Sequence, residues 1–206
     1  MLVHPSDPVA EFAGDVWWVR GDMNRAATAY EAARNDAEQH GVAGERATSQ
    51  AQRAFVIAFT DPHRANDELE LAQQLLSGLD LRATTLATQI AALVRDAGTT
   101  RDLEDRARVL RTEAAVAGIV SAQVMAELAL CFHHAVQNDH DKVNTAISRL
   151  RDLTRENYTY YVDIAQFMAD APLDQVSEAR WLDSEQHTRN RWRGVVTARQ
   201  APHSGR

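Results

Sequence analysis

Helix-breaking residues recur along this chain at a nearly constant interval, and this recurrence constrains the fold more than any other feature. Glycine and proline number only 9 and 5 among 206 residues, so each cluster of breakers marks a turn between long helices. Four turns, each followed by a helix start, recur about every 39 residues: Gly21-Asp22, Thr60-Asp61-Pro62, Gly98-Thr99-Thr100 and Asn138-Asp139. A second set of breakers falls between them. The spacing predicts about ten helices, paired as hairpins.

The predicted hairpins cover almost the whole chain. Apolar side chains recur at helical spacing between the turns, as in Val143, Ile147 and Leu150, and this pattern predicts amphipathic helices. A lone hairpin cannot bury both helix faces, so such hairpins stack. We therefore expect one all-α domain, a superhelical array over residues 1–198, with a flexible tail at 199–206. Its five antiparallel hairpins are expected at about 7–40, 44–77, 81–117, 119–156 and 157–198.

A specific pattern of small and aromatic residues surrounds the first turn. It comprises Gly14 and Trp17 before the turn, and Ala26, Tyr30 and Ala33 after it. Small residues let two helices approach, and the aromatic rings fill the gap to the next hairpin. Over residues 7–40 this motif resembles a tetratricopeptide repeat. The other hairpins share the architecture but depart from the motif, since their period exceeds the family's roughly 34 residues.

The resemblance implies a right-handed superhelix whose concave face, lined by the first helix of each hairpin, binds an extended or helical peptide. Such a groove would suit a ligand with a hydrophobic anchor and basic flanks. A second interpretation makes Trp18 and Phe132 core contacts, and Trp17 is expected in the core. Carried over residue by residue, the expected groove consists of Glu11, Asp15, Trp18, Val19, Met125, Leu128, Phe132 and Val136.

Two kinds of cluster could indicate catalysis or metal binding. Asp36 with His40, like Asp183 with His187, has the i, i+4 spacing that places two ligands on one helix face. Two half-sites do not make a metal site, so we expect no metal, no cofactor and no catalytic residue. The neighbours of Cys131 could supply a base to its thiol. We instead expect Cys131 and His134 to be packing residues, with His133 partly exposed.

The densest later aromatic segment has two interpretations. It could form a ligand pocket, or Tyr161, Ile164 and Met168 could pack inward while Tyr158 and Tyr160 lie near the surface. We favour packing.

The final helix combines tryptophan with arginine. Such a segment can bind phosphates or stack on bases. It can also cap the last repeat, with Trp181 and Leu182 covering that repeat and the arginines facing water or the acidic body of the protein. We favour the capping helix.

Composition narrows the partner classes. The 22 basic and 29 acidic side chains give a formal charge of −7, which disfavours nucleic acid as a partner. No segment approaches the roughly 18 consecutive apolar residues of a membrane-spanning helix, so we expect no membrane partner. The single cysteine excludes an internal disulfide, and the first residues lack a secretory signal. These features predict a cytoplasmic protein.

Three functional hypotheses follow. The first is a non-catalytic scaffold or regulatory adaptor whose groove binds a segment of a partner protein. The second is a dimeric array that senses a small molecule or signal peptide, as in some bacterial regulators with similar repeats. The third is a helical enzyme, which requires polar side chains converging in a cleft. The first rests on the family resemblance and on the lack of a convincing catalytic motif in the sequence.

Overall fold

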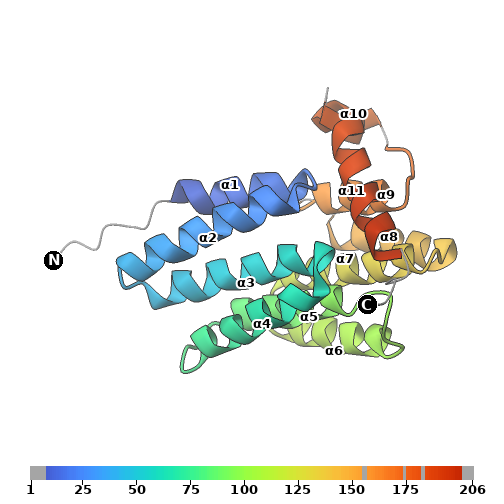
Figure 1. Ribbon diagram of the computed structural model, residues 1–206. Helices are drawn as coiled ribbons and strands as arrows, with labels where there is room; N and C mark the ends of the chain where they lie inside the picture. The colour runs from blue at the N-terminus through green and yellow to red at the C-terminus, as the bar shows by residue number, and fades with distance from the viewer. Residues whose placement is uncertain (1–7, 155–156, 174, 182–183, 201–206) are drawn as a thin grey trace, which may run out of the picture. The chain divides into compact units, whose positions relative to one another are not determined.

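The computed structural model describes residues 8–154, 157–173, 175–181 and 184–200, and every regular element in these ranges is a helix (Figure 1). The expected all-α class is therefore confirmed. The helices follow the predicted turns closely. They are α1 (Pro8–Val19), α2 (Met23–Gln39), α3 (Ala43–Thr60), α4 (Pro62–Leu76), α5 (Arg82–Arg95), α6 (Leu103–Val116), α7 (Val120–Val136), α8 (His140–Leu153), α9 (Tyr160–Met168), α10 (Gln175–Trp181) and α11 (Glu185–Gln200).

The chain divides into two compact units, Met1–Arg95 and Asp96–Arg206. The first unit contains α1 to α5, and the second contains α6 to α11. The boundary falls inside the hairpin expected at 81–117. The single superhelical array over residues 1–198 therefore stays a prediction.

Helix starts occur where the turn residues provide caps. Asp22, Asp61 and Asp139 each accept a hydrogen bond from the backbone N–H three residues later, at 3.2, 3.0 and 3.2 Å. Such caps satisfy N–H groups that have no partner within the helix. Gly21 and Gly98 adopt φ angles of 74° and 82°, which glycine tolerates because it lacks a Cβ atom. The local chemistry of the turns thus sets the helix boundaries.

Close packing between α1 and α2 depends on Gly14. A Cβ atom at this position would lie only 2.4 Å from the Tyr30 ring.

The two adjacent tryptophans of α1 differ in burial. Trp18 is 5% exposed, and its ring meets that of Phe55 edge-on, with 5.6 Å between the ring centroids. Trp17 was expected in the core, but it is half-buried, with the Arg25 guanidinium 4.6 Å above its ring. Successive helix residues point about 100° apart, and on α1 it is Trp18 that faces the core while Trp17 lies at its edge.

The core of the second unit is built around α7, which packs against α6, α8, α9 and α11. His133 was expected to be partly exposed, but it is buried, and its Nδ1 accepts a hydrogen bond from the Gly98 N–H at 3.0 Å.

On α9, the interpretation of the aromatic segment as packing residues is confirmed. Tyr161, Ile164 and Met168 are buried, whereas Tyr158 is exposed and Tyr160 is half-buried.

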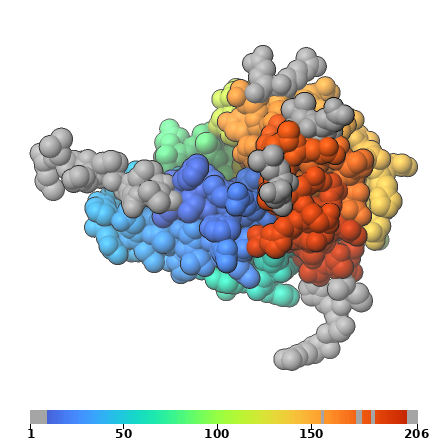
Figure 2. Space-filling model, turned by 90° about the horizontal axis from the view of Figure 1, so that it is seen from above, coloured from blue at the N-terminus to red at the C-terminus, as the bar shows by residue number. Residues whose placement is uncertain are grey.

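Figure 2 shows the helices of residues 160–200, in orange to red, gathered on one face of the second unit. Trp181 is buried, as a capping role predicts, while Leu182 lies outside the described residues. The arginines were expected to face water or acidic side chains, and Arg189 is buried against Asp170 and Glu185, while Arg199, expected in the tail, is also buried. Arg199 donates to the Ala97 carbonyl at 2.8 Å. Helix α11 continues to Gln200, so the tail expected from residue 199 begins inside a helix; residues 201–206 lie outside the description.

The two units repeat one another at an offset of 77 residues, about twice the interval between turns. Helix α3 begins at Ala43 and α7 at Val120, 77 residues later. The glycines two residues before these starts, Gly41 and Gly118, share a φ of 70°. The same offset relates Phe55 to Phe132, both buried. Corresponding positions can therefore be compared one by one.

Candidate functional site

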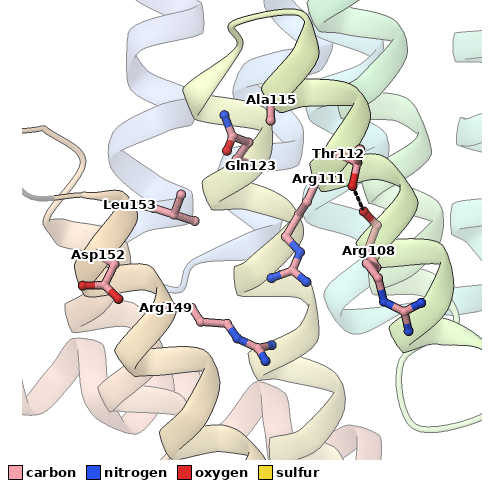
Figure 3. A pocket seen from close by; sticks show the side chains of 8 residues that line it. All are labelled: Arg108, Arg111, Thr112, Ala115, Gln123, Arg149, Asp152 and Leu153. Carbon is pink, nitrogen blue, oxygen red and sulfur yellow. Dashed lines mark hydrogen bonds between the residues drawn. The ribbon is translucent and has the colours of Figure 1, made fainter.

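A pocket of about 350 Å³ lies in the second unit, where α6 and α8 flank α7 (Figure 3). Arginine dominates its lining, and Figure 3 shows Arg111 and Arg149 reaching toward each other from α6 and α8. Ala115 and Gln123 line the opposite end. The full lining is Arg108, Arg111, Thr112 and Ala115 from α6, Gln123 from α7, and Arg149, Asp152 and Leu153 from α8.

A fully buried carboxylate on α7 connects the two arginines. Glu127, one turn after Gln123, is 0% exposed. Its Oε2 is hydrogen-bonded to Nη1 of Arg111, and its Oε1 lies 3.6 Å from Nη1 of Arg149. Burial raises the pKa of Glu127, and the two arginines oppose this shift. A buried charge requires such partners, because the protein interior solvates it poorly.

The cluster does not use all the hydrogen-bonding capacity of its arginines. A guanidinium carries five N–H donors, whereas Nε of Arg111 is buried and has no hydrogen-bond partner. The side chain of Arg149 is 53% exposed, compared with 24% for Arg111. Oε1 of Glu127 also lacks a hydrogen bond. The exposed guanidinium of Arg149 can therefore donate to a group that enters the pocket.

The pocket lining is suited to binding rather than to catalysis. The hydroxyl of Thr112 donates to the Arg108 carbonyl at 3.0 Å, as Figure 3 shows. Guanidiniums stay protonated and hold anions by hydrogen bonds, and Ala115 and Leu153 offer apolar surface at the other end. These residues can hold an anionic group attached to a short apolar body.

The first unit carries an ion pair where this pocket has short or neutral side chains. Ala115 and Gln123 correspond, 77 residues earlier, to Glu38 and Arg46. Nη2 of Arg46 lies 3.0 Å from Oε1 of Glu38, joining α2 to α3. In the second unit neither side chain of this pair is present, which leaves room for a ligand at that end.

The residues expected in the concave groove are distributed over both units. Glu11 accepts a hydrogen bond from Gln52 at 3.1 Å, and Asp15 accepts one from Tyr30 at 2.7 Å. Among the apolar members, Trp18 is buried and Val19 half-buried in the first unit. A groove shared by the two sets stays a prediction. In the second unit, Met125 is half-buried, whereas Leu128, Phe132 and Val136 are buried.

The pocket and the expected groove use different faces of α7. Phe132 follows Glu127 by five positions, so their side chains point about 140° apart on an ideal helix. The burial of Trp18 and Phe132 agrees with the second interpretation, in which they are core contacts.

The arginine pocket was not predicted from the sequence. A signal was present, because Glu127 interrupts an otherwise apolar run from Val124 to Phe132, and a charge inside such a run needs a buried partner.

Among the described residues, the remaining candidate reactive groups do not come together in a second site. Burial raises the pKa of the Cys131 thiol to about 12, which leaves it protonated and unreactive near neutral pH. In the first metal half-site, Nδ1 of His40 lies 3.4 Å from Asp36. Asp183 of the second lies outside the described residues. Across the described ranges, no three His, Cys, Asp or Glu side chains are grouped to hold a metal ion.

No model of a protein family matches this chain, and neither the curated proteins nor the solved structures contain a significant match. None of the helices in the described ranges combines the length and apolar character needed to cross a membrane.

Proposed function

We propose that this protein is a non-catalytic binding module of the tetratricopeptide kind that holds a segment of a partner protein, with the pocket between α6 and α8 as its binding site. One observation carries the proposal. The positions that the Glu38–Arg46 ion pair occupies in the first unit carry Ala115 and Gln123 in the second, where they line a pocket together with Arg111 and Arg149. Convergent polar groups in a concave, partly apolar site are typical of ligand binding.

The resemblance to tetratricopeptide repeats contributes the kind of partner. The fit of Gly14 against Tyr30 supports it, because this close approach explains the small residue in the motif. Repeat modules of this kind bind peptides. An acidic side chain or a chain terminus of such a peptide would enter the arginine pocket.

A small-molecule sensor is the second candidate, and the pocket volume favours it. Binding sites for small molecules range from about 300 to 1,000 Å³, and about 350 Å³ falls at the lower end. In this case the pocket would enclose most of its ligand rather than a single side chain of a longer peptide.

The test introduces a copy of the Glu38–Arg46 ion pair at the corresponding positions of the second unit. The double variant Ala115→Glu plus Gln123→Arg should fill the apolar end of the pocket. A matched control, Ala83→Glu plus Gln89→Arg, places the same residue types at exposed positions of α5. Wild type and both variants are compared for capture of partners from the native lysate, after circular dichroism shows equal helicity. Captured proteins are identified by mass spectrometry, and their segments are titrated directly.

We expect wild type and the control to retain a partner that the rebuilt variant loses. A partner that all three proteins retain equally would contradict the assigned site. If no protein is retained, but a small molecule raises the unfolding temperature of wild type and not of the rebuilt variant, the second candidate replaces the first.

A further inference from the structure

We infer that the pocket between α6 and α8 takes a carboxylate, and that Glu127 is an internal counter-ion with which this carboxylate competes for Arg111 and Arg149. The inference rests on the proposed binding function of the pocket and names its ligand class and the residue that sets its affinity.

The charge of the pocket lining favours an anionic ligand. Arg108, Arg111 and Arg149 line the pocket together with Asp152, and Glu127 pairs with Arg111 and Arg149. Arg108 pairs with Asp105 at the surface, where both side chains are about two-thirds exposed. Exposed ion pairs of this kind contribute little and rearrange readily. An anion that takes the place of Asp105 at Arg108 would therefore break no buried pair.

The geometry of Arg111 and Arg149 favours a planar, two-oxygen acceptor. Each arginine approaches a different oxygen of Glu127, so the two guanidiniums already surround one carboxylate. Arginine donors match carboxylates in parallel pairs. A second carboxylate, entering from the solvent side, would meet the guanidinium of Arg149, whose side chain is 53% exposed.

Comparison with the first unit shows that this position does not require a negative charge to pack. Glu127 corresponds to Gln50, which is also 0% exposed. Nη1 of Arg34, the counterpart of Arg111, donates to Oε1 of Gln50 at 2.9 Å. Arg149 has no counterpart of this kind, because Ala72 stands 77 residues earlier. At these two positions the second unit therefore has a carboxylate and an arginine where the first has an amide and an alanine.

The apolar end of the pocket limits the size of the group that carries the ligand's carboxylate. Ala115 and Leu153 leave space for a short aliphatic group near the carboxylate. A leucine at the C-terminus of a peptide, a free organic acid, and a Glu side chain beside a leucine share this chemistry. The probes must therefore separate a terminal or free carboxylate from a side-chain carboxylate.

The experiment is a titration of the full chain followed by NMR of the arginine Nε–H groups. The first probe is N-acetyl-leucine, with N-acetyl-leucinamide as its uncharged match. The second is the capped peptide acetyl-Leu-Glu-Leu-amide, with acetyl-Leu-Gln-Leu-amide as its match. We expect at least one acid to bind at least tenfold more tightly than its amide and to shift the signals of Arg111 and Arg149. Tighter binding of N-acetyl-leucine would identify a free or terminal carboxylate, and tighter binding of the peptide a side chain.

Two variants test the competition. Glu127→Gln, which copies Gln50, should bind the acid at least threefold more tightly, because it frees donors without removing a hydrogen-bond acceptor. Arg149→Gln, at an exposed position, should bind at least fivefold more weakly. Because Arg149 is exposed, this second variant keeps the test decisive if Glu127→Gln fails to fold.

The outcomes separate the two proposals. If acids and amides bind this pocket equally well, it is a binding site and the carboxylate assignment is wrong. If the acid binds but Glu127→Gln binds it no more tightly, the counter-ion role is wrong. If no probe binds wild type or Glu127→Gln, while a partner segment still binds at the pocket, only this inference fails. If neither probes nor partner bind, the proposed function fails with it.

Discussion

Each unit buries one glutamate on a helix, and the two glutamates are held in different ways. In the first unit, Oε2 of Glu68 accepts hydrogen bonds from Gln50 and Arg53 at 2.8 and 2.5 Å. Arg53 is itself only 8% exposed. In the second unit, Glu127 is paired with Arg111 and Arg149, whose guanidiniums reach the surface. Each cluster also has one arginine that is 53% exposed and lies 3.6 Å from its glutamate, Arg64 in the first unit and Arg149 in the second. We call the first cluster closed, because Glu68 is bonded to the buried Gln50 and Arg53, and the second open, because Arg111 and Arg149 line a pocket.

The repeated framework places the two clusters in different surroundings. The position on the first helix stays buried in both units, as Gln50 and Glu127. What changes is the surroundings, because the Glu38–Arg46 pair is replaced by Ala115 and Gln123. A closed polar network favours one packing arrangement. An open network keeps donors available, so we expect the first cluster to stabilise the fold and the second to serve binding.

The largest effect is expected from breaking the closed cluster. Glu68→Ala leaves the buried charge of Arg53 without its closest partner, and removal of one member of a buried pair costs about 3 to 5 kcal/mol. Urea unfolding would measure the loss, with Glu70→Ala at the neighbouring exposed position as the control. Glu127→Ala should cost less, because its arginines can turn toward water. A larger loss for Glu127→Ala than for Glu68→Ala would reverse the comparison.

A second difference between the units concerns acid stability. Val56 and Ile57 of the first unit correspond to His133 and His134 of the second, and all four are buried. Burial lowers the pKa of His133 from 6.5 to about 4 and also lowers the pKa of His134. The neutral histidines therefore stabilise the second unit above about pH 6.5, and this contribution is lost as the pH falls toward 4.

Between pH 7 and pH 4.5 the second unit should lose about 2 kcal/mol more than the first. Urea titrations followed by residue-resolved NMR at both pH values would measure each unit separately. The variant His133→Val plus His134→Ile, which copies the first unit, should remove most of this pH dependence. Equal acid sensitivity of the two units in wild type would show that the histidines do not control it.

The smallest effect is expected from removing the Glu38–Arg46 ion pair of the first unit. Glu38→Ala plus Arg46→Gln removes an ion pair whose side chains are 53% and 35% exposed. Such pairs contribute about 1 kcal/mol or less, so the midpoint of urea unfolding should hardly change. A loss of several kcal/mol in the free energy of unfolding would mean that the ion pair is part of the structural framework.

Helix boundaries could be predicted from the sequence because the signals that set them are local. Asp22, Asp61 and Asp139 cap the helices that follow them, and Gly21 and Gly98 supply the positive φ angles of the turns. Each of these effects acts within a few residues.

The site could not be predicted in the same way, because it depends on which helix faces meet. Arg111 and Arg149 stand 38 positions apart in the chain and converge only because α6 and α8 both pack on α7. The same limit applies to Trp17, which was expected in the core in addition to Trp18. His133 was misjudged because its partner, the Gly98 N–H, lies 35 residues away.

The central claim is that the open cluster binds an anion and the closed cluster does not. The most direct measurement is an NMR titration of wild type with N-acetyl-leucine and with acetyl-Leu-Glu-Leu-amide that compares arginine Nε–H signals in both units. The account predicts that one of these acids produces saturable shifts at Arg111 and Arg149, and leaves Arg34 and Arg53 unchanged. Shifts at Arg34 and Arg53, or small shifts spread evenly over exposed arginines, would contradict it.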